Sequence, residues 1–182
     1  MTSAAKSSAA PFKWKSAPVP SDPDRIKILD SWDILNIGSF ACEELSRWTH
    51  GKSRIVTMNH SCKDSFLALW RAWEKEGVLE VLKADYTPAP TRALVHDGWG
   101  GAYNPRYKRG VAHDQNPNHL SNHASGHAFD IATRRYPLGA KVAGPDPIQL
   151  LVPIAEAHGW KWGGRFSRPD PMHFQHVTSP FT

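Results

Sequence analysis

The sequence is poor in cysteine, with two in 182 residues. Cys42 and Cys62 lie in segments that we expect to be helical, and their separation is not the paired spacing of a metal site. This scarcity excludes a disulfide framework and a cysteine-rich zinc site. We interpret both residues as reduced members of the core.

The chain also lacks any apolar run long enough to span a bilayer. Its first residues, MTSAAKSSAAPFKWKS, have no apolar central region of the kind that secretion requires. No repeat recurs at a solenoid period. We therefore expect synthesis in the cytoplasm and no membrane span.

Acidic residues are fewer than basic ones, 17 against 22, which gives a net charge of +5 and an isoelectric point near 9.3. This balance suits nucleic acid, anionic lipid or the carboxylate- and phosphate-rich bacterial envelope. The sequence has no basic run with interleaved aromatic residues, no helix-turn-helix pattern and no zinc-finger spacing. We expect no nucleic-acid partner, and charge alone does not choose among the others.

The length suits one domain of ordinary size with its own hydrophobic core. Residues 1–24 are rich in Ala, Ser, Pro and Lys, a composition that predicts a flexible tail. We expect residues 25–182 to form a single domain and the protein to be a monomer.

The clearest predicted elements of the first half are a strand and a helix. The β-branched stretch Ser53–Met58 predicts a strand. In the helix that follows, Ser61 and Asp64 have the spacing of a capping box, and Gly77 marks the end. One face of this helix carries apolar residues that we assign to the core: Phe66, Leu69, Trp70 and Trp73.

In the second half, residues 97–110 are dense in glycine and aromatic residues and predict a strand and turn. DPIQLLVPIAEAHG predicts a helix with Asp146 as its cap and Gly159 at its end, and we expect Pro153 to kink it or delay its start. Residues 160–166 predict another strand and turn.

The stretch LSNHASGHAFDIA, residues 120–132, concentrates polar residues of metal-binding type. His123 and Asp130 would be roughly 23 Å apart on a strand or roughly 10 Å apart on a helix, whereas zinc ligands lie about 2 Å from the ion. They can share a metal only if the chain folds back, and Gly126 lies where such a turn would fall. AFDIA then predicts a strand that carries Asp130 inward. The alternative is that both residues are solvated surface groups.

A second polar group follows near the C-terminus in DPMH, which supplies Asp170 and His173. The prolines at 169 and 171 disfavour a regular helix, so we expect a turn that enters the strand HFQHV. A set of two histidines and one aspartate leaves one tetrahedral position open, which is typical of catalytic zinc.

These two segments resemble the zinc D-alanyl-D-alanine carboxypeptidase and L-alanyl-D-glutamate peptidase family, which includes many phage endolysins. SNHASGHAFD matches its S-x-H-x-x-G-x-A-x-D pattern, and DPMH matches [DE]-x-x-H. WGGAYNPRYKRG and HGWKWGGRF are similar to flanking segments of the phage-type branch. The resemblance covers roughly residues 99–177.

The resemblance implies one zinc ion per chain, with three ligands: His123, Asp130 and His173. It implies that Asp170 is the general base of a zinc-activated water and that Arg106 steadies the scissile carbonyl as it becomes an oxyanion. Ser121 would support the turn or contact substrate. The implied fold is α+β, of the hedgehog and D-Ala-D-Ala peptidase type: a small antiparallel sheet holds the zinc, with helices packed on one side.

The substrate groove is predicted less directly. An endopeptidase that cuts between L-Ala and D-Glu needs an open groove, for which Trp99, Trp162 and Arg165 are candidates, although core packing suits both tryptophans equally well. His127 occupies a variable position of the pattern and is not expected to bind metal. Gln175 stands where a glutamate often follows the last histidine, which would alter an outer contact without removing a ligand.

Three functional interpretations remain. The first is a zinc peptidase that cuts peptidoglycan stem peptides, specifically an L-alanyl-D-glutamate endopeptidase acting as a phage or prophage endolysin. It would stay in the cytoplasm until released to the host envelope. Asp170, in place of a glutamate, favours this branch. The second is a D-alanyl-D-alanine carboxypeptidase of the same fold, and the third is a non-catalytic, zinc-stabilised wall-binding module, against which Asp170 and Arg106 weigh.

Overall fold

A computed structural model describes residues 12–84 and 98–181. Its central feature is a four-stranded antiparallel sheet in the order β5-β6-β8-β7. The strands are β5 (Trp99–Gly101), β6 (Ala128–Ile131), β8 (His173–His176) and β7 (Trp160–Trp162). Two further antiparallel pairs precede it in the chain: β1 (Trp14–Ser16) with β2 (Ile26–Ile28), and β3 (Ile37–Ala41) with β4 (Ile55–Asn59).

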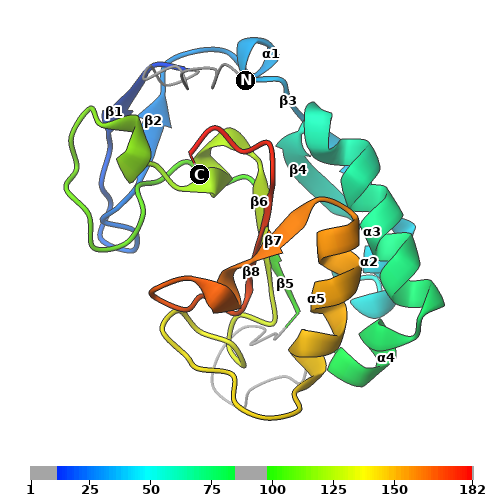
Figure 1. The fold of residues 1–182 in the computed structure, drawn as a ribbon. Helices are drawn as coiled ribbons and strands as arrows, with labels where there is room; N and C mark the ends of the chain where they lie inside the picture. The colour runs from blue at the N-terminus through cyan, green and yellow to red at the C-terminus, as the bar shows by residue number, and fades with distance from the viewer. Residues whose placement is uncertain (1–11, 85–97, 182) are drawn as a thin grey trace, which may run out of the picture.

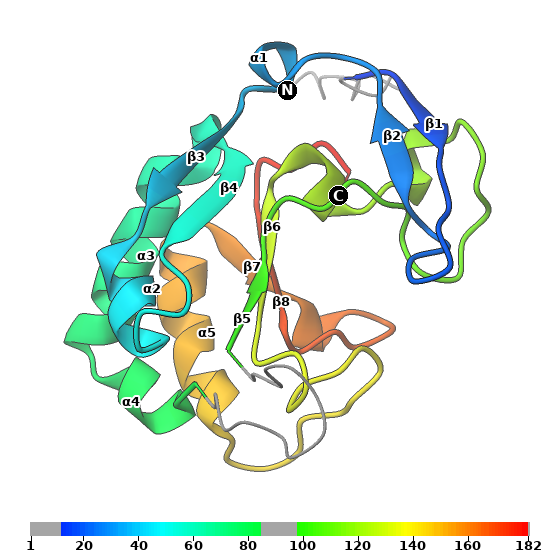
Figure 2. The same ribbon diagram turned by 180° about the vertical axis from the view of Figure 1, so that it is seen from behind.

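Apart from the short α1 (Trp32–Leu35), the α-helices gather on one side of the central sheet, and the β1–β2 hairpin lies on the other (Figures 1 and 2). The α-helices are α1 (Trp32–Leu35), α2 (Glu43–Trp48), α3 (Lys63–Lys75), α4 (Val78–Leu82) and α5 (Pro147–Ala157). Short 3-10 turns are η1 (His60–Cys62), η2 (Pro117–His119), η3 (Asn122–Ser125) and η4 (Gly163–Arg165). This arrangement confirms the predicted α+β class. No helix among the described residues has the length and apolar character needed to cross a membrane.

The main core lies between helix α3 and the sheet. All four core residues predicted on α3 are fully buried. Their rings meet the aromatic residues of the sheet edge to face, with centroids 5.2 Å apart for Phe66 and Phe129 and 5.5 Å apart for Trp73 and Phe174. Because side chains alternate along a strand, Phe129 and Phe174 face the helices while Asp130 and His173 face the other way.

A second core cluster joins the N-terminal segment to the region around η3. Its buried members are Phe12, Trp14, Ile26, Leu35, Ile37, Tyr107, Leu120, Ala124 and Phe181. The flexible tail expected over residues 1–24 is therefore wrong from residue 12 onward, because Phe12 and Trp14 bury their rings and β1 pairs with β2. Residues 1–11 lie outside the described residues.

Of the two long helices, α3 differs from the sequence prediction at its start and α5 agrees with it. Helix α3 begins at Lys63 without a side-chain cap, because Asn59 caps the preceding turn η1 and accepts both the amide and the hydroxyl of Ser61. The predicted capping box is therefore wrong, whereas Gly77 follows the helix in the left-handed conformation as expected. In α5, Asp146 accepts the amide of Ile148, which confirms the predicted cap.

Other local predictions concern Pro153 and the cysteines. Pro153 lies inside α5 and does not delay the helix, which starts at Pro147. Cys42 and Cys62 flank helices α2 and α3 and are buried and free of disulfides, as predicted for core residues.

Gly126 is a position at which an added Cβ would meet the backbone of a neighbouring strand. It ends η3 with φ +69°, and a Cβ there would lie 2.5 Å from the backbone nitrogen of Asn59. Gly51 has a similar φ of +76° but open space around it. We expect Gly51→Ala to lower the free energy of unfolding by about 1–2 kcal/mol, the strain of a left-handed alanine. Gly126→Ala should lower it by a further ~1–3 kcal/mol, because the backbone of Asn59 must shift.

Urea denaturation of the two variants beside the wild type measures the difference. Equal losses of stability would show that the close approach of Gly126 to β4 does not constrain the fold.

Candidate metal centre

The turn that carries His123 folds the chain back onto strand β6. Ser121 starts η3, and its hydroxyl accepts the amide of His123 at 3.3 Å. Gly126 ends the turn and accepts the amide of Asn59 at 3.0 Å, which ties the turn to β4. His123 and Asp130 therefore lie next to each other across a turn. Their separation in the sequence requires such a turn if the two residues are to bind one ion.

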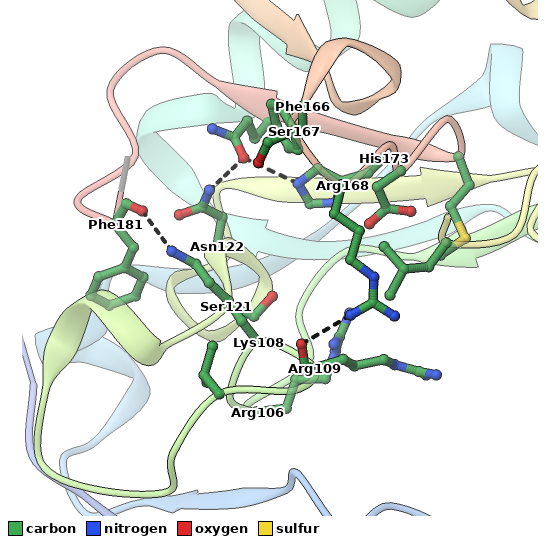
Figure 3. Close-up of a pocket in the computed structure, with 15 residues that line it drawn as sticks. Arg106, Lys108, Arg109, Ser121, Asn122, Phe166, Ser167, Arg168, His173 and Phe181 are labelled. Atoms are coloured by element: carbon green, nitrogen blue, oxygen red, sulfur yellow. Dashed lines mark hydrogen bonds between the residues drawn. The ribbon is translucent and has the colours of Figure 1, made fainter. Parts of the chain in front are cut away.

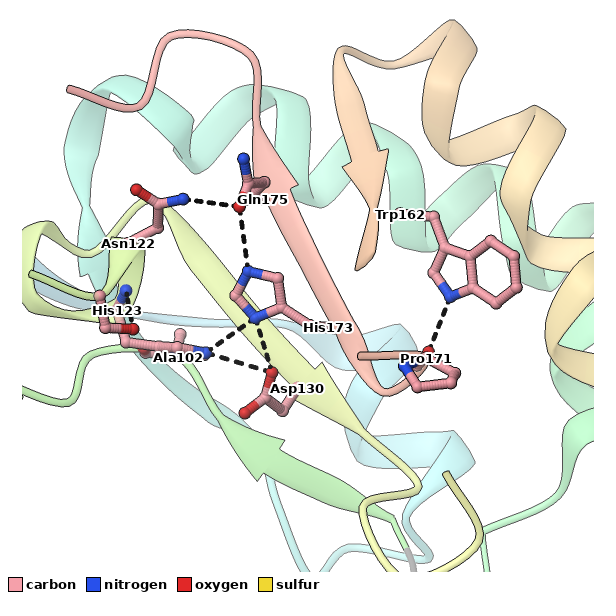
Figure 4. Close-up of polar contacts among 9 residues, drawn as sticks. Ala102, Asn122, His123, Asp130, Trp162, Pro171, His173 and Gln175 are labelled. Atoms are coloured by element: carbon pink, nitrogen blue, oxygen red, sulfur yellow. Dashed lines mark hydrogen bonds and ion pairs between the residues drawn. The ribbon is translucent and has the colours of Figure 1, made fainter. Parts of the chain in front are cut away.

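Strand pairing brings the third residue to the same place. Asp130 and His173 are direct partners in the β6–β8 register, so their side chains project side by side from one face of the sheet. Asp130 Oδ1 lies 3.0 Å from His173 Nδ1 and 3.1 Å from His123 Nε2, and the two histidine nitrogens are 3.1 Å apart (Figure 4). All three residues are buried. This group has the composition and spacing to hold one metal ion.

The outer nitrogens of both histidines are held by oxygen acceptors. His123 Nδ1 lies 2.6 Å from the carbonyl oxygen of Ala102, and His173 Nε2 lies 3.3 Å from Gln175 Oε1. A neutral imidazole that donates from one nitrogen presents a lone pair on the other. Two lone pairs and a carboxylate oxygen of Asp130 then converge at about hydrogen-bond distance, an arrangement that a cation satisfies. The residues present therefore fit a metal ion.

Gln175 takes part in this arrangement rather than disturbing it. Its Oε1 accepts from Asn122 Nδ2 at 2.6 Å as well as from His173 (Figure 4). Asn122 in turn accepts the hydroxyl of Ser179 at 2.5 Å. A neutral amide oxygen thus occupies the place at which the family pattern often has a glutamate, and it fixes the orientation of the ring.

The charges within the group reinforce one another. Burial alone would raise the pKa of Asp130, but His123 and His173 outweigh it and hold that pKa far below its usual range. Burial would lower the pKa of His173, but Asp130, together with Asp170 and Gln175, outweighs burial and raises that pKa. Asp130 is consequently a carboxylate at neutral pH, as a metal ligand must be.

Asp170 lies on the turn before β8 with one carboxyl oxygen unsatisfied. Its Oδ1 is buried and has no hydrogen-bond partner among the described residues. Burial raises the pKa of this carboxyl above its usual value, an effect that the nearby charges of His173 and Arg106 oppose. A buried oxygen without a partner costs free energy and often marks a functional position. Asp170 is thus available to accept a proton.

Gly163 allows the turn to form, a requirement that the sequence analysis did not identify. It accepts the amide of Asp170 at 2.9 Å, and a Cβ on it would lie 2.5 Å from the Asp170 carbonyl oxygen and 3.1 Å from His173 Cβ. The Trp-Gly-Gly triplet at 162–164 was the available signal, because glycine permits such close backbone approach.

A cavity of about 520 Å³ opens beside the group (Figure 3). Five of the residues singled out in the sequence line it: Arg106, Ser121, Asp170, His173 and Gln175. Lys108 and Arg168 also line the cavity together with Arg109, although no sequence motif predicted the first two as site residues. Asp170 is the one acidic residue among these lining residues, so the wall is mainly positive.

The comparison with known proteins coincides with this centre. Residues 114–176 match the model of a family described as D-alanyl-D-alanine carboxypeptidase. The match covers 63 of the 182 residues of the chain. The match confirms the predicted resemblance and identifies the segment as that of a peptide-bond hydrolase. Among curated proteins and solved structures, no match to the chain is found.

The matched peptidase segment contains the three clustered residues and Asp170, whereas Arg106 precedes it. Arg106 nevertheless lines the same cavity. Its carbonyl oxygen accepts the amide of Ser121 at 3.0 Å, which joins its segment to the turn that carries His123. The cavity is thus lined in part by a residue that lies before the matched segment.

Three candidates for a substrate groove are not among the residues that line this cavity. Trp99 packs on Phe129 in the main core, with ring centroids 5.9 Å apart. Trp162 is buried and donates to the carbonyl of Pro171 at 2.7 Å, and exposed Arg165 pairs with Glu156. Core packing explains both tryptophans, because their strands turn these rings toward the helices. Their assignment to the groove is wrong for this cavity.

His127 stands apart from the peptidase's metal group. It is buried, and its Nδ1 lies 2.9 Å from the carbonyl oxygen of Ser125. Burial lowers its pKa, which keeps the ring neutral. The metal-binding group found among residues 12–84 and 98–181 does not include it.

Metal content distinguishes these histidines. We expect His123→Ala and His173→Ala to lose the bound metal and the activity, because each variant keeps only two of the three protein ligands and two are too few to hold the ion. His127→Ala should keep both. Elemental analysis of the purified variants measures the ion per chain, and chelation followed by metal addition tests reversibility. Loss of metal from His127→Ala would contradict the assignment.

Proposed function

We propose that the protein is a zinc peptidase that hydrolyses peptidoglycan stem peptides between L-alanine and D-glutamate. The observation that carries the proposal is the convergence of His123, Asp130 and His173 beside the unpartnered carboxyl oxygen of Asp170. A buried acid without a partner, next to a group that can hold a metal, is expected in a hydrolase and has no use in a purely structural site.

Zinc is the metal that best suits this ligand set. Two imidazole nitrogens and one carboxylate oxygen leave a fourth tetrahedral position for substrate or water, as in catalytic zinc sites. When bound, zinc supplies Lewis acidity and lowers the pKa of water. The outer contacts to Ala102 and Gln175 keep both rings aimed at the ion.

In this mechanism Asp170 is the general base, and it later returns the proton to the leaving amine. Its raised pKa makes it a better proton acceptor than an exposed aspartate. Arg106 lines the same cavity, and its guanidinium can donate to the carbonyl oxygen as negative charge develops there. Ser121 is assigned to the support of the turn, because its hydroxyl caps η3.

The positive wall of the cavity supports an anionic substrate. Arg106, Lys108, Arg109 and Arg168 line it. Stem peptides carry free carboxylates, and the net charge of +5 suits the acidic wall around them. The aspartate at position 170 supports the L-alanyl-D-glutamate branch of the family.

The resemblance of residues 99–110 to the phage-type branch supports action as a phage or prophage endolysin. On this proposal the protein is made in the cytoplasm and acts on the host envelope after release. The main alternative is a D-alanyl-D-alanine carboxypeptidase, which the description of the matching family favours. Arg109 would then hold the terminal carboxylate.

The released products separate these alternatives. We expect digestion of purified peptidoglycan to expose new D-glutamate amino termini and to leave glycan strands that bear L-alanine. Mass spectrometry of the fragments detects both. Release of free D-alanine without solubilisation of the wall would instead establish the carboxypeptidase.

Substitutions in the cavity separate chemistry from metal binding. Asp170→Asn should retain the metal and the fold but lose several orders of magnitude in kcat, because the proton acceptor is gone. Arg106→Ala should lower kcat by about 10²-fold or more with the metal in place. Steady-state kinetics with metal analysis measures both. Near-normal turnover in either variant would assign its role to another residue.

A further inference from the structure

The segment that carries Arg106 is held along one edge by the N-terminal hairpin. Ile26 donates its amide to the carbonyl of Pro105 at 3.0 Å, and Tyr107 donates its amide to the carbonyl of Asp24 at 2.9 Å. These two bonds form an antiparallel bridge around Arg106. The backbone of the hairpin is thereby paired, as in a sheet, with the backbone of Arg106, whose side chain lines the cavity.

The opposite edge of the same segment is bonded to the turn of the metal centre. The amide of Ser121 donates to the Arg106 carbonyl at 3.0 Å, and the amide of Asn104 donates to the His123 carbonyl at 3.1 Å. Residues 104–107 thus lie between the hairpin and the turn that carries His123. The hairpin closes the outer edge, which would otherwise have unpaired backbone groups.

Tyr107 anchors this segment in the second core cluster. Its side chain is fully buried, and its hydroxyl accepts from Trp14 Nε1 at 3.2 Å and donates to the Asp114 carbonyl at 3.0 Å. Its ring stacks on that of His113, with centroids 4.6 Å apart. Because side chains alternate along extended backbone, burial of Tyr107 in this core directs Arg106 to the opposite side, into the cavity.

We propose that the β1–β2 hairpin, acting through Trp14 and Tyr107, positions Arg106 for catalysis. The inference rests on the proposed role of Arg106 at the scissile carbonyl. A displacement of about 1 Å at a catalytic group can lower a rate by 10²-fold, so backbone bonds and packing that fix Arg106 matter beyond their share of stability. The hairpin is consequently part of the catalytic apparatus, although it lies outside the family-matched segment.

The first test is Trp14→Ala, which removes a buried ring of the second core together with its hydrogen bond to the Tyr107 hydroxyl. We expect kcat on purified peptidoglycan to fall about tenfold or more with unchanged metal content. Trp14→Phe retains most of the packing and loses only the indole donor, so it should recover most of the rate. Trp48→Ala is the matched control, because Trp48 is similarly buried and donates to a backbone oxygen, that of Leu79, in the main core. It should lower stability and leave the kcat of the folded protein unchanged.

The second test combines the substitution with Arg106→Ala. If the hairpin acts through Arg106, Trp14→Ala should have little further effect on kcat in the Arg106→Ala background. Multiplied losses, or a normal kcat in folded Trp14→Ala, would overturn the inference. A normal kcat in Arg106→Ala alone would reject the proposed role of Arg106 and, with it, the catalytic purpose of the hairpin.

Amide hydrogen exchange gives a readout that does not depend on activity. Trp14→Ala should speed exchange at Tyr107 and Ser121, whose amides form the two edges of the Arg106 segment, and Trp48→Ala should not. Unchanged exchange in Trp14→Ala would overturn the positioning role even if the protein proved inactive on peptidoglycan. Failure of the proposed function and failure of this inference therefore give different results.

Discussion

Three electron-rich atoms, His123 Nε2, His173 Nδ1 and Asp130 Oδ1, lie within about 3.1 Å of one another where little water reaches. Such atoms repel unless a proton or a cation lies among them, and the repulsion grows in a buried environment. The outer contacts to Ala102 and Gln175 turn both rings so that their lone pairs face inward. The convergence therefore requires a shared proton or a bound cation, and the surrounding fold holds this geometry.

Each layer of the molecule contributes to that task. The β6–β8 register sets Asp130 beside His173, and the aromatic core behind the sheet keeps both strands in place. The second core supports the wall of the cavity that carries Arg106, because the neighbouring residue, Tyr107, is buried in that core. Gly163 lets η4 lie close against the turn bearing Asp170 and the start of β8. The three clustered residues, Asp170 and Arg106 thus come from separate segments that two cores fix relative to one another.

Sequence patterns over a few neighbouring residues predicted the elements that depend on interactions between those neighbours. The buried face of α3 follows from helical periodicity, and the reversal between His123 and Asp130 follows from a glycine placed where the chain must turn. The second core could not be predicted, because the composition of residues 1–24 as a whole is that of a tail. It gives no sign that Phe12 and Trp14 pack against residues far away in the sequence. Trp162 was ambiguous for a related reason: sequence alone does not tell which face of a short strand meets the helices.

Anomalous diffraction at the zinc absorption edge, from crystals of the active protein, tests the central claim most directly. The account predicts one peak per chain at about 2.0–2.1 Å from His123 Nε2 and His173 Nδ1, bonded also to a carboxylate oxygen of Asp130. Asp170 should lie near the peak without ligating it. A peak bound instead to His127, or a catalytically active protein with no ion among these three residues, would contradict the account.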